Sequence, residues 1–339
     1  MKQLLVLCGG QSPEHVISVR SCGNVLKALD RSKYAVTLIG ITKKGQWTLL
    51  DEGNVPAEIT SEENLVEIRP GQSDCFWSAG KSLGEFDVIF PLLHGPNGED
   101  GTIQGLLQLL GIPFVGCKLL SAAVSMDKDI TKRLLEKAGV HVAKWKLLTK
   151  SDPIPSFSEV ADKLSNVVFV KPSNMGSSVG VHRVTNSEEW DHAIQDAFTY
   201  DSRVLVEEAI KGKELECAVL GNGAPEATGV GEVQSGDFYS YEEKYEATSV
   251  AELVIPAQVD SSHVDDLKST AIKTYKALDC KGLARVDMFL TENGNILVNE
   301  VNTMPGFTNI SMYPKLWEQE GLGYSALIDR LIDLASVNY

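Results

Sequence analysis

The chain has 339 residues, which is long for a single hydrophobic core and predicts two or three domains. A formal net charge of −15, in an otherwise ordinary globular composition, argues against nucleic acid or an anionic membrane as a partner. No stretch is long enough to span a membrane, and the six scattered cysteines lack a CxxC pattern. We therefore expect buried thiols in a reducing cytoplasm, without zinc or redox roles.

The first third of the chain alternates apolar runs with helical patterns. We expect strands at Leu4–Cys8, Tyr34–Thr42, Phe86–Leu93 and Ile112–Val115, and helices after the first strand and over Thr102–Leu110. Strands joined by crossover helices predict a parallel sheet, whose ligands gather at the carboxyl ends of the strands. Glu14 and His94 each follow such a strand, so we expect both at one ligand-binding edge.

Two further blocks follow. The second begins near Ser121 and predicts a helix through Met126, Asp127 and Lys128, strands at Val167–Lys171 and Val204–Glu207, and between them a helix after Asn186 with Glu189 as its capping-box partner. The third starts near Lys213 and contains a polar, aromatic loop over Gln234–Ser249, a helix over Val264–Leu278, a pair of apolar-alternating runs and two C-terminal helices.

The pair of alternating runs, Leu283–Leu290 and Ile296–Val301, predicts a β-hairpin. Asn293-Gly294 lies between them, and Asn-Gly favours a two-residue turn because both turn residues need positive φ. With such a turn Asp287 faces Glu300 and Arg285 faces Asn302.

Two carboxylates placed directly opposite each other destabilise a sheet unless something compensates their charge. A divalent cation held by Asp287, Glu300 and Asn302 would do so, and this oxygen set suits Mg²⁺ completed by phosphate and water. A shared proton, or Arg285 bridging the pair, is the plainer alternative.

Phosphate-binding features are present without a P-loop or a GxGxxG motif. The strand ending at Lys171 leads into a Gly/Ser-rich loop, Met175–Gly180, which offers one positive charge and several backbone N–H groups to a phosphate. The same loop matches GxSxG at Ser178. A serine hydrolase needs that serine at a sharp strand-to-helix turn, whereas His182-Arg183-Val184 predicts a second strand here, so this alternative is disfavoured.

The ordered motifs resemble those of D-alanine–D-alanine ligases of the ATP-grasp superfamily over almost the whole chain. They are Gly9-Gly10 with Glu14–Ser18, His94-Gly95 with Gly98–Gly101, Met126–Lys128, Val170–Pro172 with Gly176–Gly180, Glu243–Tyr245, Arg285–Asp287 and Glu300–Gly306. The resemblance implies a three-domain α/β ATP-grasp fold with an N-terminal parallel α/β domain. The expected domains are residues 1–120, which bind substrate, residues 121–212, the central ATP-grasp subdomain, and residues 213–339, the C-terminal ATP-grasp subdomain with the metal site.

The resemblance also implies the reaction: ATP phosphorylates the carboxylate of one D-alanine, and the amine of a second attacks the acyl phosphate. The implied cofactors are ATP and two Mg²⁺ ions, for which Mn²⁺ substitutes, and the implied partners are these small molecules and a second copy of the chain. Peptidoglycan synthesis in the cytoplasm is the expected role, with the loops Gln234–Ser249 and Met175–Gly180 as lids.

Carried over to this sequence, the family's site residues fall into four groups. The expected ATP-binding residues are Lys128, Lys171, Glu207, Glu208, Ile210, Glu214, Lys244, Phe289 and Asn299. The expected metal ligands are Asp287, Glu300 and Asn302. The expected catalytic residues are Glu14, Ser177, Tyr245, Arg285, Gly306 and Ser311, with Arg285 and the Gly306 N–H stabilising the oxyanion. The expected substrate-binding residues are Glu14, His94, Ser311 and Met312.

Two positions depart from the usual family pattern. Glu208 stands where lysine is frequent, which bears on the adenine contacts, and Met312 stands where leucine is frequent, a change between apolar side chains of similar size. Relatives that make D-alanyl-D-lactate carry histidine in the loop that holds Tyr245 here. The tyrosine favours an amine acceptor and leaves D-serine open as the second substrate. A nucleotide-binding regulator without chemistry would be expected to lack Lys171, Arg285 or the hairpin acids.

Overall fold

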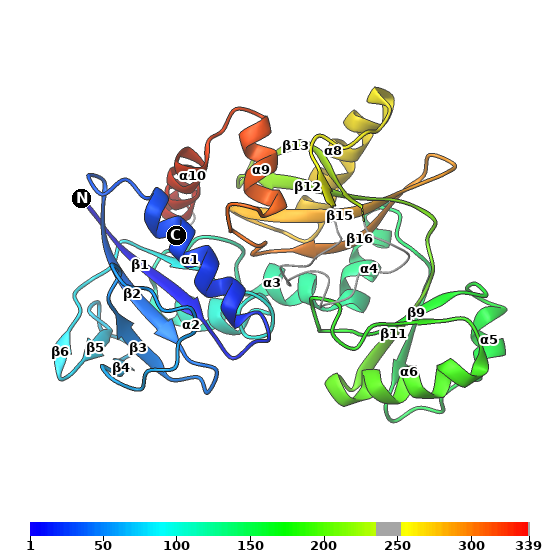
Figure 1. The fold of residues 1–339 in the computed structure, drawn as a ribbon, viewed down its shortest axis with the longest axis horizontal. Coiled ribbons are helices and arrows are strands. Elements are labelled where there is room, and N and C mark those ends of the chain that lie inside the picture. The colour runs from blue at the N-terminus through cyan, green and yellow to red at the C-terminus, as the bar shows by residue number, and fades with distance from the viewer. Residues whose placement is uncertain (235–251, 338–339) are drawn as a thin grey trace.

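The first of four β-sheets is built from the N-terminal residues of the computed structural model, which describes residues 1–234 and 252–337 (Figure 1). Its strand order is β3-β2-β1-β7, with β1 (Lys2–Gly9) parallel to β2 (Tyr34–Ile41) and to β7 (Val88–Pro91), and β3 (Trp47–Leu50) antiparallel at the edge. The predicted parallel sheet is confirmed. The predicted strand Ile112–Val115 was wrong, because only a single parallel bridge, from Phe114 to Ile89, forms there.

Both faces of β1 are buried, which explains its unbroken apolar run. Leu4 and Val6 pack against Val19 and Cys22 of α1 (His15–Ala28). Alternate residues of β1 pack on the other side against α2 (Thr102–Leu110). A small antiparallel sheet of β4 (Val66–Ile68), β5 (Phe76–Ser78) and β6 (Lys81–Ser82) flanks this domain.

The helix predicted through Asp127 is in fact two helices, α3 (Leu119–Met126) and α4 (Lys128–Lys137). Asp127 has an extended backbone, and its carboxylate accepts the backbone N–H of Ile130 at 3.0 Å, which makes it the N-cap of α4. The break places Lys128 in the first turn of α4, at the edge of the site described below.

The second sheet has the order β10-β9-β11-β8, from β8 (Trp145–Thr149), β9 (Val168–Pro172), β10 (His182–Val184) and β11 (Arg203–Glu208), with all neighbours antiparallel. Its core side packs against α5 (Phe157–Ala161) and α6 (Ser187–Tyr200). Asn186 caps α6 as predicted, but the Glu189 carboxylate accepts the N–H of Thr185 at 2.7 Å and not that of Asn186.

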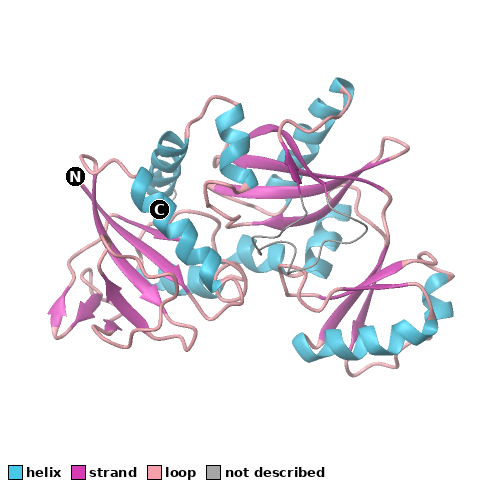
Figure 2. Ribbon diagram, viewed as in Figure 1, coloured by secondary structure: helices cyan, strands magenta, loops and turns pink. Residues whose placement is uncertain are grey.

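The third sheet carries the hairpin and has the order β14-β13-β12-β15-β16. Its strands are β12 (Gly212–Leu220), β13 (Glu226–Gln234), β14 (Glu252–Val254), β15 (Leu283–Thr291) and β16 (Ile296–Asn302), and α8 (Ser261–Ala277) covers one face. The C-terminal helices α9 (Met312–Gln319) and α10 (Tyr324–Val337) share one apolar core with α1 and β1 (Figures 1 and 2). The domain boundaries near residues 120 and 212 stay predictions.

The predicted pairs of the hairpin are confirmed, although its turn was predicted wrongly. Asp287 faces Glu300 and Arg285 faces Asn302, but Leu290 faces Ile296 and Met288 faces Val298. The turn therefore has three residues, and a β-bulge at Asn299 adds one residue to β16. The bulge restores the register that a two-residue turn without a bulge would have produced.

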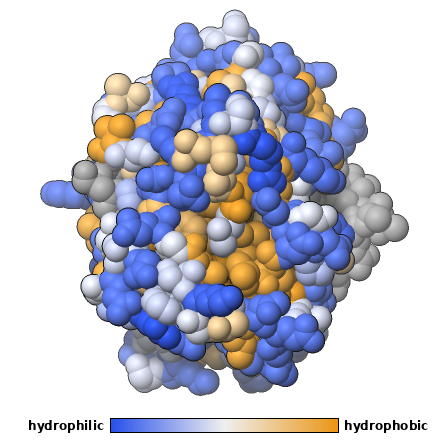
Figure 3. All heavy atoms as spheres, turned by 90° about the vertical axis from the view of Figure 1, so that its left-hand side faces the viewer, coloured by the Kyte–Doolittle hydropathy of each residue, from blue (hydrophilic) through white to orange (hydrophobic). Residues whose placement is uncertain are grey.

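Figure 3 looks onto the side of the N-terminal sheet and shows hydrophilic residues interspersed with apolar areas on that face. In residues 1–234 and 252–337, no helix has both the length and the apolar character needed to cross a membrane.

Candidate functional site

A cavity of about 1050 Å³ brings together residues from all three predicted domains. Its lining includes Glu14, His94, Glu99, Lys128, Gly176, Ser177, Glu216, Arg285, Glu300, Asn302, Gly306, Ser311 and Met312. Ten of these thirteen residues are site residues that the sequence predicted. The other three are Gly176, which belongs to the predicted phosphate loop, and Glu99 and Glu216, to which we had assigned no role.

Three carboxylates lie side by side on three neighbouring strands of the third sheet. Glu216 on β12 faces Asp287 on β15, and Asp287 faces Glu300 on β16. Glu216 was not predicted as a site residue, because its neighbour Asp287 is distant in the sequence and the pairing of β12 with β15 has no local signal. A local signal was present for Glu216 itself, since it is a charged residue between the apolar residues Leu215 and Cys217.

Arg285 neutralises part of this acidic ladder. Its Nε and Nη2 atoms donate to the two carboxylate oxygens of Asp287, each at 2.7 Å, and Nε also lies 2.9 Å from Oε2 of Glu216. Burial opposes the guanidinium charge, but Asp287 and Glu216 outweigh it and raise the pKa of Arg285. A fork held in this way is a rigid positive group facing the cavity.

The donor set fits a divalent cation that has further ligands. Three carboxylates face Arg285 and Lys128, whose Nζ lies 3.5 Å from Glu300, so one negative charge is left over. The Asn302 amide donates Nδ2 to Asp287 at 2.9 Å, which leaves its carbonyl oxygen for another partner. In the described part of the chain, no group of three or more His, Cys, Asp or Glu side chains is placed to hold a metal alone. A cation here would need Asn302, water and phosphate oxygens.

A second charged cluster lies on the face of the second sheet away from α6. Glu207 is 5% exposed and pairs with Lys171 and, at 2.9 Å, with Lys132 of α4. Burial alone would raise the pKa of this carboxyl group, but Lys132 and Lys171 outweigh burial and lower it to about 2. Lys132 was not predicted as a site residue. It lies one helical turn after Lys128 and is fully buried in the structure.

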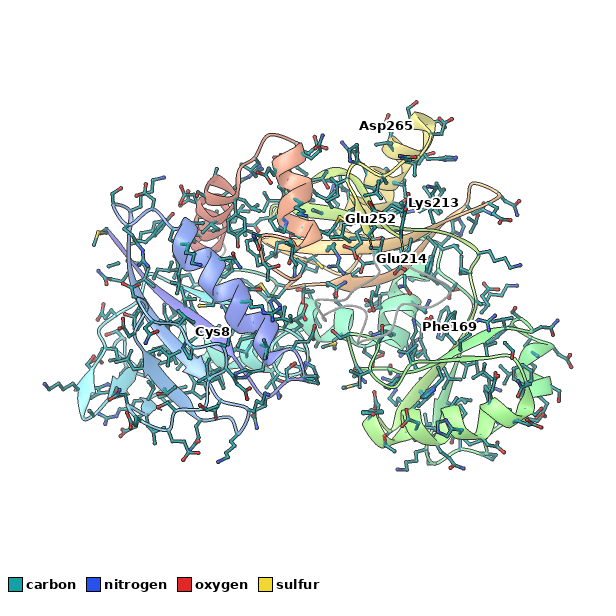
Figure 4. The ribbon with its side chains drawn as sticks, in the orientation of Figure 1. Cys8, Phe169, Lys213, Glu214, Glu252 and Asp265 are labelled. Atoms are coloured by element: carbon teal, nitrogen blue, oxygen red, sulfur yellow. The ribbon has the colours of Figure 1, made fainter. Side chains whose placement is uncertain are left out.

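The remaining predicted ATP-binding residues lie outside the lining of the cavity. Glu214 faces Phe289 across β12 and β15, and Figure 4 shows Glu214 and Phe169 on the facing sides of the third and second sheets. Glu208 accepts the N–H of Lys144 at 2.8 Å. The last two are Ile210, in the β11–β12 connection, and Asn299, at the bulge. Lys244, Tyr245 and residues 235–249 of the predicted lid lie outside the described residues.

The Gly/Ser-rich loop touches the N-terminal domain. Ser177 donates its hydroxyl to Oε1 of Glu14 at 2.6 Å, so two residues 163 positions apart meet at one end of the cavity. Ser178 has a φ of 58° within a loop that joins two antiparallel strands. The strand-to-helix elbow that a GxSxG nucleophile requires is therefore not formed, and the hydrolase alternative loses its structural basis.

Residues at the start of α9 also line the cavity. Ser311 is the N-cap residue of that helix but makes no side-chain capping bond. Its Oγ instead accepts the N–H of Thr308 at 3.0 Å and lies 2.8 Å from the Thr308 hydroxyl. A Cβ atom on Gly306 would lie 3.0 Å from the same Oγ, so the glycine lets the two groups approach. Met312, the next residue, is buried.

Comparisons with known proteins agree with the resemblance found in the sequence. A family model described as "D-ala D-ala ligase N-terminus" matches residues 3–117, and one described as "D-ala D-ala ligase C-terminus" matches residues 134–333. A D-alanine–D-alanine ligase of Shouchella clausii is 47% identical, with 98% of this chain and 94% of that protein covered.

Two solved structures are similar along their whole lengths. The VanG D-Ala:D-Ser ligase from Enterococcus faecalis has a TM-score of 0.90 and 38% identity, covering 98% of this chain and 99% of that one. A D-alanine–D-alanine ligase from Bacillus anthracis complexed with ATP has a TM-score of 0.75 and 28% identity, covering 99% and 97%.

Proposed function

This chain belongs to the D-alanine–D-alanine ligase family, and we propose that the cavity lined by its three predicted domains is the ligase active site. The enzyme is an ATP-dependent ligase that joins two D-alanines through a D-alanyl phosphate, for peptidoglycan synthesis. The observation that carries the assignment of the site is the meeting, in one cavity, of the Glu14–Ser177 pair, the Arg285 fork and Ser311.

The first half-reaction needs a carboxylate to be held against the terminal phosphate of ATP. Glu14 would bind the ammonium of the first D-alanine, and its bond from Ser177 fixes the carboxylate for that contact. Lys128 and Lys171 would neutralise phosphate oxygens as ATP transfers its terminal phosphoryl group to the D-alanine carboxylate and ADP leaves. A contact with the Gly/Ser-rich loop supports this role for Lys128, whose Nζ donates to the carbonyl of Met175 at 2.7 Å.

In the second half-reaction the amine of the second D-alanine attacks the acyl carbon, and inorganic phosphate leaves. The negative charge that develops on the acyl oxygen would be stabilised by Arg285 and by the N–H of Gly306. Ser311 would accept the carboxylate of the second D-alanine, and Met312 would border its methyl group. Asp287, Glu300 and Asn302 would hold two Mg²⁺ ions, which would neutralise phosphate charge when bound.

The nucleotide would lie between the facing sides of the second and third sheets. Glu207, Glu208, Ile210 and Glu214 come from β11, β12 and their connection, and Phe289 and Asn299 come from the hairpin. From the family we also propose that the enzyme is a cytoplasmic homodimer and that Mn²⁺ can substitute for Mg²⁺. Light scattering and a metal panel test these two points.

The test of the function is ADP release in the presence of ATP, Mg²⁺ and D-alanine, with the dipeptide identified by mass spectrometry. We expect activity to require D-alanine, with L-alanine inactive. ATP turnover indifferent to D-alanine would reject the proposal. D-serine belongs in the same panel as the second substrate, because the VanG D-Ala:D-Ser ligase is among the similar structures. If D-alanyl-D-serine forms in greater amount than D-alanyl-D-alanine, the second subsite would be assigned to D-serine.

A further inference from the structure

The segment Thr303–Phe307 links the hairpin to α9 and carries Gly306, yet it belongs to neither element. Side chains of the N-terminal domain hold it at both ends. His94 Nδ1 lies 2.8 Å from the carbonyl oxygen of Met304, and the Oγ of Ser21 accepts the N–H of Phe307 at 3.2 Å. Ser21 and His94 also contact each other, with Oγ 3.1 Å from Nε2. The contacts form a closed ring around the residues that flank Gly306.

The chemistry of these groups fixes the direction of each hydrogen bond. The Met304 carbonyl is only an acceptor, so Nδ1 of His94 carries the proton and donates it. In the neutral ring Nε2 is then an acceptor, which requires the Ser21 hydroxyl to donate to it. The Ser21 oxygen keeps a lone pair for the Phe307 N–H. Every donor in the ring has an acceptor, with Ser21 as the connecting group.

Burial and charge favour this arrangement. Ser21 is fully buried and His94 is 3% exposed. Burial lowers the pKa of His94, although the Glu14 charge partly opposes this effect, so the ring stays neutral near pH 7. Glu99 also faces the segment, with Oε1 accepting the N–H of Met304 at 3.0 Å. Met304 is thus held at its N–H and at its carbonyl.

We propose that Ser21 is a positioning residue, which acts through His94 to hold the Met304–Phe307 segment so that the Gly306 N–H faces the reacting acyl group. This inference rests on the proposed function. Both ring nitrogens of His94 are used by protein groups, so the histidine would serve the substrate by placing this segment. Ser21 has no other assigned role, and it does not line the cavity.

The test compares Ser21→Ala with wild type and with Ser21→Thr, which keeps the hydroxyl. We expect Ser21→Ala to lower kcat roughly ten- to a hundredfold, less than the 10²–10³ lost when an oxyanion donor is removed outright. KM for ATP should stay the same, because the nucleotide site does not depend on the ring. Ser21→Thr should restore most of the loss in kcat.

The pH profile separates positioning from a general loss of structure. Without the Ser21 hydroxyl, Nε2 of His94 loses its donor, which raises the pKa of the imidazole and favours its protonated form. The acid limb of kcat should therefore move to higher pH in Ser21→Ala. The negative charge of Glu14 faces the same ring and favours the protonated imidazole in the same direction.

Ser78→Ala is the matched control, since Ser78 is a buried serine that donates to a backbone carbonyl, that of Asn64 at 3.1 Å, in the small sheet. We expect it to change thermal stability without changing kcat or the pH profile. The inference is overturned if Ser21→Ala keeps the wild-type kcat, or if its acid limb does not move. Wild-type protein that lacks D-alanine-dependent ADP release would instead reject the proposed function.

Discussion

The two ion pairs of Glu207 predict how strongly its replacement lowers the free energy of unfolding. Glu207→Gln removes the one carboxylate that faces both Lys132 and Lys171, while preserving the size of the side chain. A carboxyl group whose pKa falls from an ordinary 4.5 to about 2 on folding stabilises the folded protein by about 3 kcal/mol at pH 7. Because Glu207 is almost fully buried, solvent screening reduces this value little.

The sign of the pH dependence follows from the lowered pKa. The stabilisation is complete above the unfolded value of about 4.5 and is lost as pH falls towards 2, because the folded carboxylate must then be protonated. At pH 7 the free energy of unfolding of the variant should be about 3–5 kcal/mol lower than that of wild type, since two ammonium groups are left without their carboxylate. Near pH 2 about half of the folded wild-type molecules carry a protonated Glu207 and most of the charge-dependent stabilisation is gone, so the difference in unfolding free energy should shrink to about 1 kcal/mol.

Urea unfolding of both proteins from pH 7 to pH 2 measures the difference. Glu208→Gln is the matched control, because the neighbouring glutamate accepts a backbone N–H and a glutamine oxygen can do the same. Its cost should stay below about 1 kcal/mol at every pH. If the difference in unfolding free energy between wild type and Glu207→Gln is independent of pH, the charged form of Glu207 is not the source of the stabilisation.

Three further predictions concern the hairpin. Asp287→Asn should raise the Mg²⁺ concentration for half-maximal ADP release at least tenfold, and an unchanged Mg²⁺ titration would contradict the metal assignment. Arg285→Lys should lower kcat roughly 10²- to 10³-fold with KM for ATP little changed, since a lysine cannot bind Asp287 with two donors; a parallel rise in KM would point to a binding role instead. Deleting Asn299 should remove the bulge but keep Glu300 opposite Asp287, because Glu300 then directly follows Val298, which faces Met288. The Mg²⁺ concentration for half-maximal ADP release should therefore stay close to that of wild type, and a rise as large as that of Asp287→Asn would show that the metal site needs the bulge itself.

The N-terminal fold could be predicted because its signals are local. The run Leu4–Cys8 is buried on both faces, and α1 presents its apolar residues at helical spacing towards one of them. The break at Asp127 was missed because the residues around it keep helical spacing. Its cause is tertiary, since the carboxylate that caps α4 also binds Ser173, at 3.1 Å, and Arg203 of the second sheet.

The sequence predicted the site residues that belong to the ordered motifs, but it did not predict Glu216, Lys132 or Ser21, which lie outside them. Glu216 lies on a buried part of a strand and Lys132 on a buried side of a helix. A charged side chain at such a position is expected to pair with a group of opposite charge. The partners could not be named, however, because Asp287 lies 71 residues from Glu216 and Glu207 lies 75 residues from Lys132. Ser21 gave no signal at all, since a buried serine in a helix is common and its contact with Phe307 spans 286 residues.

The hairpin shows how a correct pairing can follow from an incorrect turn. A three-residue turn alone would have placed Asn299 opposite Asp287, with an amide where the ladder has its third carboxylate. The bulge at Asn299 shifts β16 by one residue beyond that point, so that Glu300 and Asn302 turn towards the cavity and Val301 towards the core. Three turn residues and one bulge residue take up the same length of chain as a two-residue turn with one further pair, so both arrangements place Glu300 opposite Asp287. Deleting Gly294 shortens the turn and leaves the bulge in place, so the acidic ladder should survive and the Mg²⁺ dependence of ADP release should stay close to that of wild type. Loss of Mg²⁺-dependent activity in this variant, with an unchanged circular dichroism spectrum, would show that the bulge forms only with the three-residue turn.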